Sequence, residues 1–140
     1  HVTIFVTAID TWLDSPLIGS GIKSFRVNCK NKLHLPNRVC ESHPHNYYLG
    51  ILNSTGIIGI ILVISILFLI FKNFIKLNLL NNNKLFLVYN AVTISLLVEL
   101  FPVRSSGDFF STQSSTFIFL LIGMSWGLII KNNSNKLKAN

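Results

Sequence analysis

The sequence is poor in acidic residues, in cysteine and in charge of either sign. It has 5 Asp and Glu against 12 Lys and Arg, 2 Cys, and only 12% charged residues among 140. The few carboxylates include no DxD pair, which argues against a metal-dependent transferase that uses nucleotide sugars, and the two cysteines form no CxxC motif. Half of the residues are hydrophobic and the mean hydropathy is +0.54, which is typical of a membrane protein.

The excess of basic residues gives a net charge of +7 but does not indicate a nucleic-acid partner. The basic residues lie in connections between apolar runs and are not interleaved with aromatics on a soluble fold. We therefore expect membrane lipids or phosphate-bearing substrates as partners, and no nucleic acid.

Apolar runs predict three transmembrane helices, at 47–71, 85–101 and 112–130. Residues 1–18 are predicted to be an interfacial helix or the end of an earlier span. The fold class that follows is an all-α membrane protein, a polytopic helical-bundle fragment with about three transmembrane helices and a periplasmic loop. The chain begins at His1 and not at Met, so we expect the C-terminal part of a larger membrane domain.

The distribution of lysines predicts the orientation of these helices. Lysines occur in 72–84 and in 131–140, so these are the predicted cytoplasmic loop and tail. The loop 19–46 and the turn 102–111 then face the periplasm. The periplasmic loop carries a basic cluster that the insertion rule disfavours, and an anionic ligand would explain it: Lys23, Arg26, Lys30, Lys32 and Arg38. Arg26, which follows "GSGIKSF", is the favoured ligand-binding residue, whereas Lys30 and Lys32 are interpreted as ordinary surface lysines.

Both cysteines, Cys29 and Cys40, fall in this predicted periplasmic loop. An oxidising compartment favours a disulfide between them, which would contribute about 3 kcal/mol in the chain-entropy model. Two alternatives remain open. One is a zinc site, for which the loop has enough ligands, although their spacing is irregular: Cys29, His34, Cys40, His43 and His45. The other is a pair of free thiols.

The histidines of "SHPHN" stand where the loop becomes a helix. Pro44 disfavours helical geometry at His43 and suits a first helical turn, so the helix is predicted to begin at about Pro44–Asn46. His45 would then lie at a helix N-terminus, where unpaired N–H groups attract phosphate and disfavour imidazolium. A neutral histidine beside a phosphate site is suited to act as a base.

Two glycines follow on the same predicted helix. Gly56 comes 11 residues after His45 and Gly59 follows it, which in a continuous helix puts both near the face of His45. The expected result is a stripe of bare backbone against which another helix packs closely.

These segments resemble the O-antigen ligase family. "HNYYLGILNSTGIIGIIL" fits the pattern H-[NSQ]-x9-G-x-x-G-x-x-[LTY] through His45, Asn46, Gly56, Gly59 and Leu62. "SPLIGSGIKSF" is similar to the segment that leads into the family's large periplasmic loop, and "FPVRSSGDFFSTQSSTFIFLLIG" to its closing turn and last span. Gly50 departs from the pattern, because related sequences often have Glu or Gln there.

The resemblance implies a metal-independent, inverting glycosyl transfer at the outer face of the bacterial inner membrane, without a cofactor. The donor would be a glycan on undecaprenyl pyrophosphate, and the acceptor a hydroxyl of lipid A–core or a similar molecule. His45 would act as the base and Arg26 would hold the pyrophosphate. The other implied binding residues are Arg38, Lys23, Asn46, His43 and Arg104. The 140 residues alone would be inactive, because the rest of the donor site would lie upstream.

Other interpretations stay open from the sequence. A polymerase that joins lipid-linked repeat units has the same chemistry. A non-enzymatic multi-pass protein with a zinc-binding loop belongs to a different class. Arg104 also has a second interpretation, a structural ion pair with the intramembrane Glu99.

Overall fold

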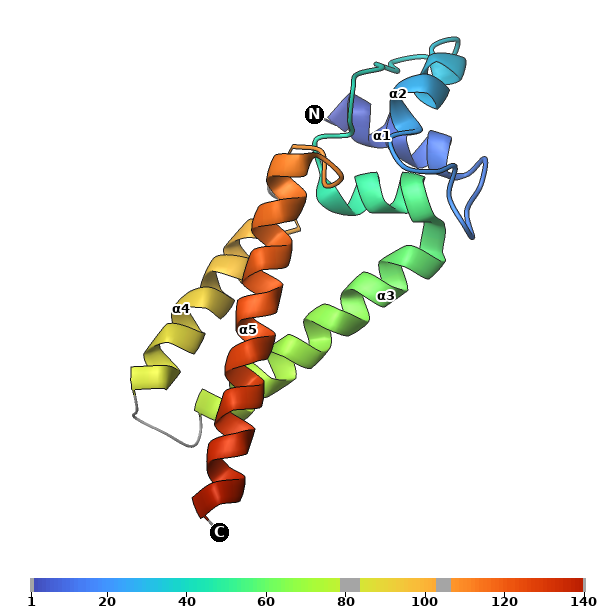
Figure 1. Ribbon diagram of the computed structural model, residues 1–140. Helices are drawn as coiled ribbons and strands as arrows, with labels where there is room; N and C mark the ends of the chain where they lie inside the picture. The colour runs from blue at the N-terminus through green and yellow to red at the C-terminus, as the bar shows by residue number, and fades with distance from the viewer. Residues whose placement is uncertain (1, 79–83, 103–106, 140) are drawn as a thin grey trace. The chain divides into compact units, whose positions relative to one another are not determined.

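The structure is a computed structural model that describes residues 2–78, 84–102 and 107–139. Its helices are α1 (Val2–Trp12), α2 (Phe25–Asn28), the 3-10 helix η1 (Cys29–Lys32), α3 (Tyr47–Asn78), α4 (Lys84–Glu99) and α5 (Thr112–Ala139), as Figure 1 shows. The described residues contain no β-strand. The expectation of an all-helical fold is therefore confirmed.

Two helical segments are long and apolar enough to cross a membrane. They are Tyr47–Lys72 in α3, with 26 residues, and Thr112–Lys131 in α5, with 20 residues. The helix α4 has 16 residues. At about 1.5 Å per residue it measures about 24 Å, less than a bilayer core of about 30 Å. The chain thus fits a helical membrane protein with two candidate spans, and the span predicted at 85–101 is a shorter helix.

The chain divides into two compact units. Unit 1 comprises His1–Ile64 and Pro102–Ser115, and unit 2 comprises Ser65–Phe101 and Thr116–Asn140. Within unit 2, the hydroxyl of Tyr89 in α4 donates a hydrogen bond of 3.1 Å to the backbone oxygen of Ile70 in α3. Both residues are buried. Unit 1 contains the described candidate site residues, and the site is therefore built from this unit alone.

The core of unit 1 joins α1 to the loop that follows it. Ile4 and Ala8 of α1 pack with Phe25 of α2 and Cys29 of η1. Partly buried apolar residues complete this cluster: Phe5, Cys40 and Leu49. The loop therefore packs against α1. Leu49, in the first turn of α3, packs against the same cluster.

The helix α3 is broken at Gly56, which has φ +64° and ψ −163°. In an unbroken helix the N–H groups of Ile57 and Ile58 would bond to the carbonyls of Asn53 and Ser54. Instead, the segment 16–21 lies in the break and forms hydrogen bonds with these N–H groups and with these carbonyl groups. The exchanged hydrogen bonds are Ser20 N to Asn53 O (2.8 Å), Gly21 N to Ser54 O (3.0 Å), Ile57 N to Pro16 O (3.0 Å) and Ile58 N to Leu17 O (3.2 Å). The break therefore leaves none of these backbone groups unpaired, and Figure 1 shows the resulting change of direction within α3.

Gly19 and Gly56 allow this close approach. A Cβ atom on Gly56 would lie 2.3 Å from the backbone oxygen of Leu17, and one on Gly19 would lie 2.5 Å from the backbone of Ser54. Gly59 lies against the side chain of Thr55, whose Oγ1 would be 1.9 Å from an added Cβ. The prediction that another helix packs against these glycines is therefore wrong for the residues that the structure describes. The glycines admit the loop segment and the Thr55 side chain, because the helix is discontinuous at this point.

Candidate functional site

The start of α3 is capped by Asn46. Its side-chain Oδ1 accepts hydrogen bonds from the N–H groups of Tyr48 (3.0 Å) and Leu49 (3.2 Å), and its Nδ2 donates to the backbone oxygen of Pro102 (2.7 Å). Asn46 is 7% exposed. Asn at this position is a preferred N-cap. The structure thus gives Asn46 a structural task, and a role in substrate binding stays a prediction.

This cap changes the expectation of a phosphate site at the helix N-terminus. The helix begins at Tyr47, so His45 precedes both the cap and the first helical residue. The N–H groups of Tyr48 and Leu49, which were expected to be available, are bound by Asn46. The geometry therefore does not support phosphate binding by these two groups, because their hydrogen bonds are already made.

His45 has a left-handed backbone conformation, with φ +54°. Such a conformation costs a non-glycine residue about 1–3 kcal/mol and often occurs at functional sites. The ring nitrogen Nε2 lies 2.5 Å from Oε2 of Glu41. A strained histidine is thus held beside a carboxylate.

Glu41 was not among the site residues predicted from the sequence. It stands four residues before His45, but residues 41–46 are not helical, so helical spacing does not explain the contact. The sequence feature that could have indicated Glu41 is its position directly after Cys40, in a chain with few acidic residues. The path of the loop, which the sequence does not specify, is what brings the two side chains together.

His43 lies next to His45, with ring centroids 4.2 Å apart. Its Nδ1 is 2.9 Å from the hydroxyl of Ser42. Partial burial lowers the pKa of His43 below 6.5, and the neighbouring His45 lowers it further, against the opposing effects of Asp108 and Glu41. The site therefore contains two adjacent imidazoles, of which His43 favours the neutral form.

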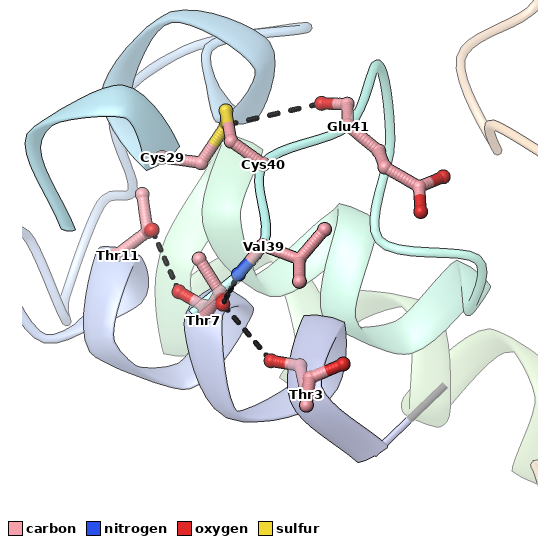
Figure 2. The surroundings of a disulfide bond; sticks show 7 residues. All are labelled: Thr3, Thr7, Thr11, Cys29, Val39, Cys40 and Glu41. Atoms are coloured by element: carbon pink, nitrogen blue, oxygen red, sulfur yellow. Dashed lines mark hydrogen bonds between the residues drawn. A yellow bond between two sulfur atoms is a disulfide. The ribbon is translucent and has the colours of Figure 1, made fainter. Parts of the chain in front are cut away.

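A disulfide joins Cys29 to Cys40 across the loop (Figure 2). Their Cα atoms are 5.3 Å apart. Val39, next to Cys40, donates its N–H to Oγ1 of the buried Thr7 in α1 (3.2 Å). The carbonyl oxygen of Glu41 lies 3.8 Å from Sγ of Cys29, a contact and not a true hydrogen bond because a disulfide sulfur has no proton to donate. The segment that enters the site is thus attached to α1 and η1 immediately before Glu41.

This pairing bears on the zinc hypothesis. Both sulfurs of the proposed ligand set lie in the disulfide, which leaves only histidines from that set. Within the described parts of the chain, no group of three or more His, Cys, Asp or Glu side chains is arranged to hold a metal ion.

The basic side chains of the loop differ in their partners. Arg38 donates from Nε to Oδ2 of Asp10 in α1 at 2.5 Å. Lys32 pairs with Asp14 at 2.7 Å. Arg26 and Lys23 are exposed and have no ion pair with any residue in the described ranges. Lys30 is exposed as well, so the structure distinguishes two cations of the loop that are ion-paired from three that face solvent.

Arg104 lies outside the described residues, and so does its proposed pairing with Glu99. The predicted binding roles of Lys23, Arg26, Arg38 and His43 likewise stay predictions. What unit 1 brings together is the capped helix start, His43, His45 and Glu41.

The first part of the chain is similar to a known protein family. Residues 2–64 match the O-antigen ligase family. The match confirms the resemblance inferred from the sequence, and it extends from α1 through the break in α3. No curated protein and no solved structure matches the chain.

The O-antigen ligase segment contains both interlocked parts of unit 1, the loop segment 16–21 and the broken helix at Gly56. The match supports, at a coarse level, glycosyl transfer of the ligase or polymerase type. Together with the apolar helices, the match supports a membrane protein of the kind that functions in lipopolysaccharide biosynthesis.

Proposed function

We propose that this chain forms part of a ligase that transfers a glycan from undecaprenyl pyrophosphate to a hydroxyl of lipid A–core or a similar acceptor. The observation that carries the proposal is the position of His45 within the O-antigen ligase segment. The ring of His45 contacts Glu41. The next residue in the chain, Asn46, is the N-cap of α3. A base for an acceptor hydroxyl requires such a fixed side chain.

In the proposed reaction, the acceptor oxygen attacks the anomeric carbon of the donor glycan. The bond from this carbon to the pyrophosphate oxygen breaks, and the lipid diphosphate leaves with the bonding electrons. The proton of the acceptor hydroxyl passes to His45. A diphosphate is already a good leaving group, so the site has to supply positive charge and not a general acid. No metal is required for this sequence of steps.

Arg26 is the better candidate for the diphosphate. Arg38 already pairs with Asp10, and recruiting it would leave that carboxylate without its ion pair. Arg26 is exposed on α2, three residues before the disulfide at Cys29, and within the described ranges it has no competing acid. Arginine also offers planar, bidentate donors that suit phosphate oxygens. Lys23, three residues before Arg26, is also exposed and would add to the local positive charge.

The proposed location is the bacterial inner membrane, with the loop 19–46 facing the periplasm. The disulfide supports this orientation, because the periplasm is oxidising and the cytoplasm is reducing. The periplasm also lacks nucleotide sugars, so a transferase there would need a lipid-linked donor.

The test of the base is His45→Asn in the complete protein, expressed in cells that lack the native gene. Asn tolerates the left-handed conformation at this position and carries no basic nitrogen, so the fold should be retained. We expect glycan transfer to fall by more than about 100-fold. The measurement is the amount of glycan attached to lipid A–core, with membrane levels of the protein as the reference.

His43→Asn is the matched control and should have a much smaller effect. Transfer at the wild-type level in His45→Asn would refute the assignment of the base. The gene deletion itself distinguishes the two reaction types. Accumulation of polymerised, lipid-linked glycan indicates a ligase, and accumulation of single lipid-linked repeats indicates a polymerase.

A further inference from the structure

We propose that Glu41 is a positioning residue for His45, which orients the imidazole for proton transfer from the acceptor. This inference rests on the proposed function and extends it to a residue outside the family pattern of histidine, asparagine and glycines. The direct observation is the contact of 2.5 Å between Oε2 of Glu41 and Nε2 of His45.

The segment from Glu41 to His45 is fixed at both ends. Before it, Cys40 is joined to Cys29, and Val39 is hydrogen-bonded to Thr7 of α1. After it, Asn46 caps α3 and is bound to Pro102. Five residues thus connect two anchored points, which limits the directions that the Glu41 and His45 side chains can take.

The partners of the other acids in the loop region differ from that of Glu41. Asp10 and Asp14 each pair with a permanently charged side chain, Arg38 and Lys32 respectively. These are ordinary ion pairs that attach the loop to α1 and to the residues that follow it. Glu41 is instead directed to an imidazole, whose protonation changes during the proposed reaction.

A carboxylate at Nε2 has two consequences for a histidine base. It favours the tautomer with the proton on Nε2, which makes Nδ1 the basic nitrogen. It also stabilises the imidazolium that forms when the acceptor proton arrives. Among the described residues, His43 lies beside this pair, with its ring 4.2 Å from that of His45, and Asp108 in turn interacts with His43.

The test compares Glu41→Gln with Glu41→Asp in the complete protein, purified in detergent and assayed with a lipid-linked glycan donor. Gln keeps the size of the side chain and removes its charge. We expect kcat to fall by about 10- to 100-fold while KM for the donor changes by less than about twofold. Glu41→Asp keeps the charge with a shorter reach, and it should recover part of the lost kcat.

Asp14→Asn is the matched control, because it removes a carboxylate of the same region that pairs with Lys32. It should leave kcat within about twofold of wild type. The melting temperature and the disulfide content of each variant report folding separately from activity.

Each outcome decides between positioning and other roles. A wild-type kcat in Glu41→Gln, a change confined to KM, or an Asp variant no better than the Gln variant would overturn the positioning role. If His45→Asn remains active, the proposed function fails first. If His45→Asn is inactive and Glu41→Gln is fully active, only the role of Glu41 is lost.

Discussion

The parts of α3 on either side of Gly56 have opposite surroundings. Before Gly56, the side chains of Tyr47, Ile51 and Asn53 are 6%, 2% and 2% exposed. After it, Ile58 and Leu62 are 53% and 60% exposed within this chain. One helix therefore begins as a buried support of the candidate site and continues as an apolar surface suited to lipid or to neighbouring helices.

The sequence of each part matches its surroundings. The first part includes "NST", residues 53–55, and the amide of Asn53 donates to the backbone oxygens of Ala8 (3.0 Å) and Leu49 (2.9 Å). The stretch from Ile57 to Phe71 has no charged residue. Polar side chains are thus concentrated where the helix meets other backbone, and the break at Gly56 marks the change.

The largest expected effect comes from removing the break. Gly56→Ala would place a Cβ 2.3 Å from the oxygen of Leu17 on a backbone with φ +64°. Strain and displacement of the loop segment together should cost at least about 3 kcal/mol. The expected result is a large fall in melting temperature and in the yield of folded protein in detergent.

The control for this substitution is Gly123→Ala in α5. A Cβ on Gly123 would meet nothing within 4 Å, and the backbone there is helical. Alanine is favoured over glycine in a helix by about 1 kcal/mol, so stability should be unchanged or slightly raised. Equal melting temperatures for the two variants would show that the close approach at Gly56 is not required.

The second prediction makes the same substitution on both sides of the break. Ile51 is 2% exposed and Ile64 is 52% exposed. Ile51→Ala should leave a cavity and lower the free energy of unfolding by about 2–5 kcal/mol. Ile64→Ala should change it by about 0.5 kcal/mol or less. The measurement is the melting temperature of each variant in the same detergent.

If the two alanine variants were equally destabilised, α3 would be buried along its whole length, and the contrast between its two parts would be lost. A loss of stability confined to Ile51→Ala would sharpen that contrast.

Features that depend on local composition were predictable from the sequence. The apolar runs gave α3 and α5, and Pro44 gave the start of α3 to within a few residues. Two cysteines leave a single intramolecular pairing, which the structure contains. Such features follow from hydropathy, backbone sterics and redox chemistry, and they need no knowledge of distant contacts.

The features that were missed depend on contacts between distant segments. His45 and Gly56 were predicted to share one face of a continuous helix, but His45 precedes the helix and Gly56 interrupts it. The exchanged hydrogen bonds join residues 16–21 to residues 53–58, and no local pattern specifies that pairing. Glu41 was missed for the same reason, since only the loop path brings it to His45.

The smallest expected effect is a pH dependence confined to the polar side of the break. The stretch from Ile57 to Phe71 has no titratable residue, whereas His43 precedes α3. The pKa of His43 is lowered from 6.5, mainly by burial. The unfolded chain therefore binds a proton at a higher pH than the folded chain does, and His43 lowers stability as the pH falls below about 6.5.

His43→Gln should remove this contribution, so the fall in melting temperature between pH 7.5 and pH 5.5 should be smaller than in wild type. Because the variant retains the other titrating groups, the difference between the two proteins isolates His43. Burial, the largest cause, does not depend on salt, whereas the weaker effect of His45 is a charge interaction that salt screens. Most of the difference should therefore persist at high ionic strength. A difference abolished by salt would show that charge repulsion, and not burial, controls His43.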